Sequence, residues 1–197
     1  MRTRRLERCG VCALPQPVCL CGRVRPIPIA TRLLVLVHWI EAFKTTNTGR
    51  LAQLAFDARY ERWGARDQPL PTLPEGPLLL LFPFEDARLL VPSDRGATLV
   101  IPDGNWPQAR KIARRVHARG DVTSVRIAEE PSRYSLRRTK RPFALSTFES
   151  IAHALGTLEG ERGPEVTAQS LAIFDAFVER HARFAAGDHA IAVGDLG

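Results

Sequence analysis

The chain has 197 residues, of which 45% are hydrophobic and 25% charged, so it can bury a core and does not resemble a disordered segment. No stretch approaches the roughly 18 apolar residues of a membrane span, and the basic N-terminus leads into cysteines, so we expect a soluble, cytoplasmic protein. A net charge of +7 fits a polyanionic partner, although a merely basic enzyme would look the same.

All four cysteines lie at the front of the chain, at Cys9, Cys12, Cys19 and Cys21. The C-x2-C and C-x-C pairs are separated by six residues, and four thiolates this close suit a tetrahedral zinc ion. Four cysteine ligands leave no open coordination position, so the zinc would be structural. An iron–sulfur cluster, a redox pair or inert thiols are the alternatives.

The first half of the remaining chain shows two strand signals around a helix. Residues 33–38 are a continuous β-prone apolar run, and the polar segment 45–49 precedes an amphipathic helix predicted over 50–60. Four prolines make 67–77 a loop, and residues 78–82 are a second apolar strand.

The second half continues this alternation. We predict strands over 98–101 and 122–127, a helix over 107–117, a helix capped by Thr147 that runs to residue 158, and a long helix over 166–185. Strands alternating with helices predict an α/β fold, with a mostly parallel sheet covered on both faces. We divide the chain into a zinc segment (1–28), an α/β domain (29–186) and a C-terminal tail (187–197).

Polar clusters follow three of the predicted strands, where ligands of open parallel sheets bind. The first holds His38 and Glu41, the second Glu85 and Asp86, and the third Asp103. Their convergence on one edge of the sheet would form a site, although a single strand-end histidine such as His38 is more often structural.

The segment from Asp103 to Trp106 carries the best candidates for chemistry. Gly104 allows a sharp turn, and Trp106 offers a flat face for an adenine or a nucleobase. The alternative is structural, with Asp103 capping the following helix and Trp106 filling the core.

Two basic tracts could contact a polyanion. Arg110, Lys111, Arg114 and Arg115 form adjacent stripes on the predicted helix, and the tract 133–141 places Tyr134 among arginines. A solvated basic face is the alternative for either tract. The sequence contains no Walker loop, G-x-G-x-x-G or G-x-S-x-G motif, which argues against nucleotide hydrolysis and serine hydrolase chemistry.

An ordered set of short motifs resembles the DTW-domain family, whose bacterial members are tRNA-uridine aminocarboxypropyltransferases. The set comprises the four cysteines, His38-x2-Glu41, Asn47-Thr-Gly49, Leu81-Phe-Pro83, Asp103-Gly-Asn-Trp106-x-Gln-Ala-Arg110, Tyr134-x-Leu-Arg137 and Ser146-Thr-x-x-Glu149. The sequence departs from the family pattern at Asn105, where the name-giving motif has threonine.

The resemblance implies a fold akin to the knotted α/β methyltransferases (the SPOUT-like fold) and a specific reaction. S-adenosylmethionine would donate its 3-amino-3-carboxypropyl group to the ring imide nitrogen of a tRNA uridine and leave as methylthioadenosine. Because the imide is mostly protonated at neutral pH, a general base helps, and our hypothesis assigns this role to Asp103. We expect no catalytic metal.

The resemblance also implies roles for individual residues. Trp106 would stack on the cofactor or the target base, and the other cofactor contacts would come from Leu81, Phe82, Pro83, Asp103, Gly104, Ser146, Thr147 and Glu149. The RNA-binding candidates are Arg110, Lys111, Arg114, Arg137 and Arg138, the first three of which could instead hold the donor carboxylate. An RNA methyltransferase on the same fold and a non-catalytic, zinc-containing RNA-binding module are the alternatives.

Overall fold

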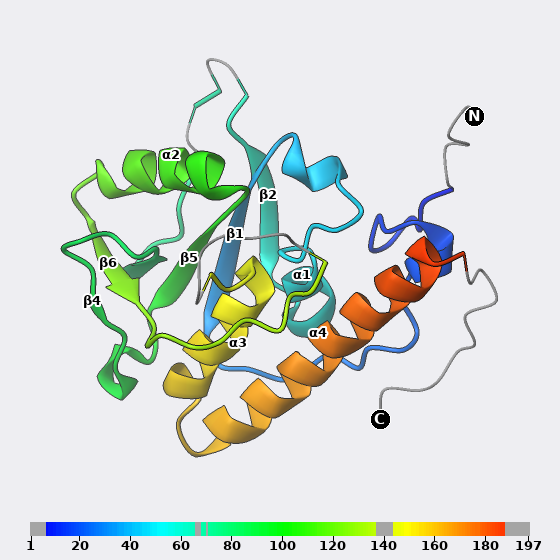
Figure 1. The fold of residues 1–197 in the computed structure, drawn as a ribbon. Helices are drawn as coiled ribbons and strands as arrows, with labels where there is room; N and C mark the ends of the chain where they lie inside the picture. Colours follow the sequence, from blue (N-terminus) through cyan, green and yellow to red (C-terminus); the bar gives the residue numbers. More distant parts are fainter. Residues whose placement is uncertain (1–6, 66–67, 70, 137–143, 188–197) are drawn as a thin grey trace.

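Six strands form one sheet in the order β2–β1–β5–β3–β6–β4, and every pairing between them is parallel (Figure 1). The structure is a computed structural model that describes residues 7–65, 68–69, 71–136 and 144–187. The strands are β1 (Arg32–His38), β2 (Arg59–Trp63), β3 (Leu78–Leu81), β4 (Arg88–Leu89), β5 (Thr98–Asp103) and β6 (Val122–Arg126). The predicted parallel α/β sheet is confirmed.

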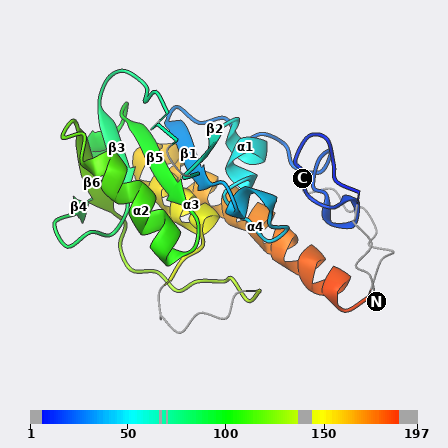
Figure 2. The same cartoon turned by 90° about the horizontal axis from the view of Figure 1, so that it is seen from above.

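Helices cover both faces of the sheet, as predicted (Figures 1 and 2). Helix α2 (Trp106–His117) packs on one face, and α1 (Leu51–Phe56), α3 (Thr147–Leu158) and α4 (Gly163–Ala185) lie on the other. The central strands are apolar on both sides: Val35 faces the core under α3 and α4, and its neighbour Leu36 faces α2. No helix among the described residues is long and apolar enough to cross a membrane.

The cysteine-bearing segment packs against the same core as the sheet. Leu14 and Leu20 are fully buried there, and Arg180 of α4 donates a hydrogen bond to the carbonyl of Pro17 (2.8 Å). Short 3-10 helices occur at η1 (Gln16–Val18), η2 (Glu41–Phe43), η3 (Pro92–Asp94) and η4 (Gly160–Arg162). The predicted domain boundary after residue 28 stays a prediction.

The helix predicted over 50–60 was too long. Helix α1 ends at Phe56, because the left-handed backbone of its C-cap residue Asp57 (φ 51°) terminates it, and β2 follows to pair with β1 along the edge of the sheet. Of the five residues of β2, only Trp63 is buried. Because an edge strand of this kind lacks an apolar alternation, the sequence did not reveal it.

The central strand β5 runs two residues beyond its predicted end, to Asp103. It pairs with β1 as far as Val37 and Asp103, but with β3 only as far as Leu80 and Val100. Pro102 has no N–H to donate to a neighbouring strand. The sheet therefore separates between β5 and β3 at its carboxyl end.

Candidate active site

Asp103 ends β5 on the sheet face covered by α1 and α3, and only 3% of it is exposed. Its two carboxylate oxygens accept hydrogen bonds from different elements. The side-chain amide of Asn47 donates to Oδ2 (2.5 Å), and the hydroxyl of Thr147 donates to Oδ1 (2.6 Å). Asp103 does not cap α2, so the structural alternative considered for it is wrong.

The segment before α1 is shaped around this carboxylate. Asn47 Oδ1 accepts hydrogen bonds from the Arg50 N–H and the Tyr60 hydroxyl (both 3.1 Å), which fixes the orientation of the amide. A Cβ atom at Gly49 would lie 2.4 Å from Asp103 Oδ2. The position of Asp103 thus explains both residues: Asn47 donates a hydrogen bond to its carboxylate, and Gly49 leaves room for it.

Burial raises the pKa of Asp103 above its ordinary value. The hydrogen bonds from Thr147 and Asn47 oppose this rise, and the nearby negative charge of Glu41 adds to it. The result is a carboxylate that takes up a proton more readily than an exposed aspartate would.

A cavity of about 370 Å³ opens beside Asp103, where β5 and β3 separate. Thr147 lines this cavity and contacts Asp103 behind its wall, so its hydroxyl connects the two. The other lining residues are Leu81, Phe82, Pro83, Ile101, Pro102, Gly104, Trp106, Ala109, Arg126, Ile127, Ala128, Glu129, Ala144, Leu145 and Ser150.

Three of the predicted cofactor contacts do not line the cavity: Asp103, Ser146 and Glu149. Ser146 caps α3 by accepting a hydrogen bond from the Glu149 N–H, and the Glu149 carboxylate accepts from the N–H groups of Ser146 and Arg133. The prediction that Thr147 caps this helix was therefore wrong, because the cap is Ser146. Thr147 is the first helical residue, and its hydroxyl is directed to Asp103 instead.

Trp106 and Asn105 begin α2. The Trp106 ring lies edge-on to Phe82, with centroids 5.5 Å apart, and it both packs against the core under α2 and lines the cavity. Asn105 caps the helix by accepting from the Gln108 N–H (3.1 Å). Asparagine and threonine are both good N-cap residues, so the departure at Asn105 preserves this local structure.

Two charged residues at the cavity were not predicted from the sequence. Arg126, whose Nε donates to the Ala87 carbonyl (3.3 Å), and Glu129 both line it after β6. The predicted basic residues Arg110, Lys111 and Arg114 lie elsewhere, on the exposed side of α2. The remaining candidates, Arg137 and Arg138, lie outside the described residues. Arg126 and Glu129 had no pattern to single them out, because only the fold brings them to the cavity.

The three strand-end clusters converge in part. Glu41 is buried near Asp103 and forms an ion pair with Lys44 (2.7 Å), and His38 is half-buried at the end of β1. Glu85 and Asp86 are exposed after β3 and do not line the cavity. Only Phe82 and Pro83, on the same turn, reach it.

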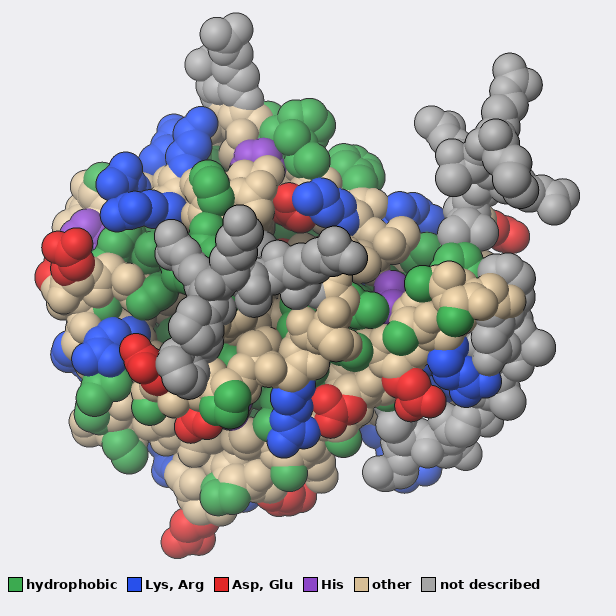
Figure 3. All heavy atoms as spheres, in the orientation of Figure 1, with side chains coloured by type: hydrophobic (Ala, Val, Ile, Leu, Met, Phe, Trp, Pro, Cys, Tyr) green, Lys and Arg blue, Asp and Glu red, His purple; other side chains and the backbone are tan. Residues whose placement is uncertain are grey.

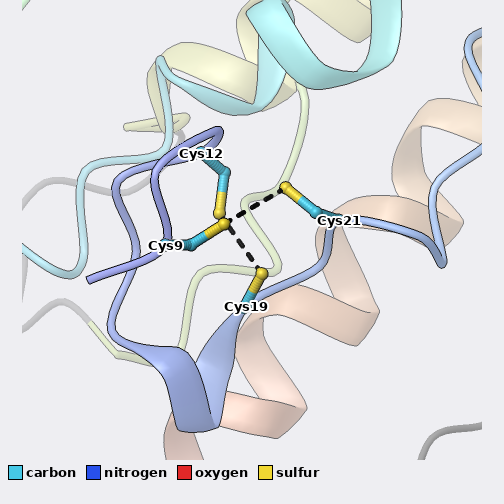
Figure 4. Close-up of side chains that lie close together, drawn as sticks. All are labelled: Cys9, Cys12, Cys19 and Cys21. Carbon is cyan, nitrogen blue, oxygen red and sulfur yellow. Dashed lines mark hydrogen bonds between the residues drawn. The ribbon is translucent and has the colours of Figure 1, made fainter. Parts of the chain in front are cut away.

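The four cysteines form a compact cluster in which the sulfur atoms point toward one another (Figure 4). All four lie within 4.8 Å of one another, with Sγ–Sγ distances of 3.7 Å for Cys9 and Cys21 and 3.6 Å for Cys12 and Cys19. Four sulfurs at about 2.3 Å from a central zinc would be spaced by about this much. The donor set therefore fits a tetrahedral metal ion.

Arg50 connects the cysteine segment to the region around Asp103. It is 5% exposed, and its guanidinium donates to the carbonyl of Cys12 (2.7 Å) and to the carbonyl of Ala42. Its backbone N–H contacts Asn47, the partner of Asp103. The cysteine segment and the candidate active site thus share a buried anchor.

These features define a parallel α/β protein with a cavity of about 370 Å³ and a buried carboxylate at the strand ends, together with a four-cysteine cluster. The sequence profile of the DTW domain matches residues 6–182. The chain belongs to the DTW-domain family.

Two similar proteins are named tRNA-uridine aminocarboxypropyltransferase 2. The one from Drosophila melanogaster is 29% identical over 170 residues, and the one from Mus musculus is 31% identical over 171 residues. Each alignment covers 79% of this chain, but only 68% of the fly protein and 57% of the mouse protein. No solved structure shows significant similarity to the chain.

Proposed function

We propose that this protein transfers the 3-amino-3-carboxypropyl group of S-adenosylmethionine to the ring imide nitrogen of a tRNA uridine and releases methylthioadenosine. The observation that carries the proposal is the cavity with Thr147 in its wall and Asp103 directly behind it. The DTW-domain match and the names of the relatives support the reaction class.

The cavity suits the donor in size and in chemistry. Its volume of about 370 Å³ lies within the range of small-molecule sites, and most of the residues that line it, Trp106 among them, are apolar. Arg126 and Glu129 supply opposite charges. Arg126 would hold the carboxylate of the donor's amino acid group and Glu129 its ammonium group, which would orient the chain that is transferred.

The reaction requires one bond to form, one to break and one proton to move. The uracil imide nitrogen attacks the sulfonium-bound carbon of the aminocarboxypropyl chain, and the carbon–sulfur bond breaks with its electron pair going to sulfur. The Thr147 hydroxyl accepts the imide proton while it passes its own proton to Asp103 Oδ1. Burial, which raises the pKa of Asp103, favours this transfer. Orientation in the cavity selects which of the three carbon–sulfur bonds breaks.

We extend the proposal to the knotted α/β fold and to the zinc ion. The cavity gathers the segments after β3, β5 and β6 with the start of α3, which supports a cofactor site built from strand-end loops. Cys9, Cys12, Cys19 and Cys21 would hold zinc, whose charge stabilises the thiolates. The exposed residues Arg110, Lys111 and Arg114 of α2 would contact tRNA phosphates.

Mass spectrometry of nucleosides tests the proposed function. Unmodified tRNA is incubated with the protein and S-adenosylmethionine, and both the nucleosides and the small-molecule products are analysed. We expect uridine that carries an aminocarboxypropyl group, and methylthioadenosine in equal amount. A methylated nucleoside with S-adenosylhomocysteine would replace the proposal with an RNA methyltransferase. RNA binding with neither S-adenosylmethionine binding nor modification would replace the proposal with a non-catalytic RNA-binding module.

A further inference from the structure

Three large hydrophobic side chains are exposed together where β1 ends. Trp39, Ile40 and Phe43 are 44%, 43% and 56% exposed and lie just after β1 and in η2, and we call them the β1-end patch. In Figure 3, hydrophobic side chains gather on the upper edge of the molecule, with Lys and Arg side chains on either side. An exposed cluster of this kind indicates an interaction site more than scattered apolar residues do.

The backbone of the patch is firmly held. The Trp39 N–H donates to the carbonyl of Trp63 (2.9 Å), which continues the pairing of β1 with β2. The Phe43 carbonyl accepts a hydrogen bond from the Arg8 side chain (2.7 Å), and the rings of His38 and Trp39 are stacked with centroids 6.3 Å apart. The two aromatic side chains are therefore presented from a fixed backbone.

Cations surround the patch. The Arg62 guanidinium lies 5.6 Å from the centre of the Phe43 ring, and Arg8 is bonded to the Phe43 carbonyl. Burial lowers the pKa of the His38 imidazole, and Lys111 of α2 lies close enough for its charge to add to this shift, which the charge of Glu41 opposes. Glu41, the acidic residue of η2, is buried and paired with Lys44.

This combination selects the chemistry of the partner. Flat rings among cations suit unpaired nucleotides, whose bases stack on aromatic side chains while their phosphates meet Arg and Lys. A symmetric contact between two copies of this chain would instead place Arg62 and Lys111 of one copy close to the same cations of the other. The charge of the patch thus favours RNA over self-association.

The patch also lies beside the candidate active site. In the register of the sheet, Val37 of β1 pairs with Asp103 of β5, and Trp39 follows Val37 by two residues. Adjacent strands are about 4.8 Å apart and each residue advances a strand by about 3.3 Å, so the backbone of the patch begins roughly 8 Å from that of Asp103. A nucleotide chain with one base at the cavity would have its next nucleotides over β1.

We propose that the β1-end patch is a stacking platform for the unpaired nucleotides that flank the target uridine in an RNA loop. This inference rests on the proposed function, because it assumes that the RNA reaches the cavity. Trp39 and Phe43 stack on bases, Ile40 contacts them, and Arg62 and Lys111 bind the adjoining phosphates. The platform makes the enzyme select a looped RNA over a fully paired one.

The test compares RNA binding by two double variants without S-adenosylmethionine. Fluorescence anisotropy measures the affinity for a labelled RNA hairpin with a uridine-containing loop and for a duplex of the same composition. W39A/F43A should weaken hairpin binding about 30-fold or more and leave duplex binding nearly unchanged, since two base-stacking contacts are lost together. L89A/V91A, which truncates two other exposed apolar residues near β4, is the matched control and should bind like the unchanged protein.

Further measurements separate the patch from the proposed function. W39F/F43Y, which keeps both rings, should retain hairpin affinity, and W39A/F43A should retain affinity for S-adenosylmethionine. If W39A/F43A weakens hairpin binding but the unchanged protein modifies no nucleoside, the stacking platform is supported and the proposed function is overturned. Modification with hairpin binding equal in W39A/F43A would overturn the platform alone. A dimer in sedimentation velocity that W39A/F43A dissociates would also overturn it and assign the face to a second copy.

Discussion

Two buried carboxylates lie at opposite ends of the sheet, and they differ in what surrounds them. Asp103, at the carboxyl end, accepts hydrogen bonds from two uncharged side chains, those of Asn47 and Thr147. Glu159, at the end of α3, accepts from the N–H groups of Ala30 and Thr31 (both 2.9 Å) and from the Thr31 hydroxyl, just before β1 begins.

Their proton affinities shift in opposite directions. Burial raises the pKa of both, but at Glu159 the hydrogen bonds from Ala30 and Thr31 and the charge of Arg162 outweigh it, so the pKa of Glu159 is lowered. The pKa of Asp103 is raised. Glu159 thus remains ionised and fastens α3 to the start of β1, and Asp103 is suited to accept a proton. Burial alone does not distinguish a structural carboxylate from a reactive one. The hydrogen-bond donors and charges around each carboxylate make the difference.

Among the residues around Asp103, the largest expected effect comes from removing the hydroxyl between Asp103 and the cavity. Thr147→Val keeps the shape of the side chain, so the fold and donor binding should survive, and the transfer rate should fall about 100-fold because the proton path is interrupted. The rate is measured at saturating tRNA and S-adenosylmethionine. Thr147→Ser restores a hydroxyl and should recover most of the rate; an unchanged rate in Thr147→Val would remove Thr147 from the mechanism.

A methyl group at Gly49 should disturb the surroundings of Asp103 next most strongly. Gly49→Ala places a carbon 2.4 Å from Asp103 Oδ2 and should lower the free energy of unfolding by about 3 kcal/mol. Gly10→Ala is the control, since a Cβ atom there meets nothing within 4 Å. Urea unfolding measures both. Equal stability of the two variants would mean that the carboxylate is not fixed in this position.

Glu159→Gln probes the other end of the sheet. The NH2 group of the new amide faces the Ala30 N–H, which loses its acceptor. The free energy of unfolding at neutral pH should therefore fall by about 2 kcal/mol. The transfer rate per folded molecule should be unchanged. Because the folded pKa of Glu159 is lowered, its stabilising effect is present above the unfolded pKa and is lost as the pH falls through the folded pKa. The difference from the unchanged protein should therefore shrink in acid. Glu161→Gln, on an exposed neighbour, should show neither effect.

The smallest effect is expected at Asn105. Asn105→Thr keeps a capping oxygen and should change the unfolding free energy by only a few tenths of a kcal/mol, whereas Asn105→Ala should lower it by about 1 kcal/mol. Thermal unfolding measures both, and transfer rates should follow the folded fraction. A large gain in transfer rate with Asn105→Thr would show that the family's threonine does more than cap α2.

The sequence predicted the parts of this molecule that depend on local pattern. The apolar runs of β1, β3 and β5 identified the buried centre of the sheet, and the polar residues after them identified Asp103. The edge strand β2 was missed because its exposed residues carry no apolar alternation. Local pattern thus predicts buried strands better than edge strands.

The partners of Asp103 depend on contacts distant in sequence. Thr147 looked like a helix cap and proved to be a hydrogen-bond donor to a residue 44 positions away. Arg126 and Glu129 come to the cavity only because β6 lies beside β3. Such pairings are set by the order of strands in the sheet, which the sequence did not provide.

The most direct test of the account compares Asp103→Asn with the unchanged protein in two measurements. Calorimetry gives the affinity for S-adenosylmethionine, and single-turnover kinetics gives the rate of aminocarboxypropyl transfer to tRNA. We predict nearly equal affinity and a transfer rate at least about 100-fold lower, because the amide cannot accept the proton. An Asp103→Asn protein that binds the donor and transfers at the original rate would contradict the assignment of Asp103 as the base.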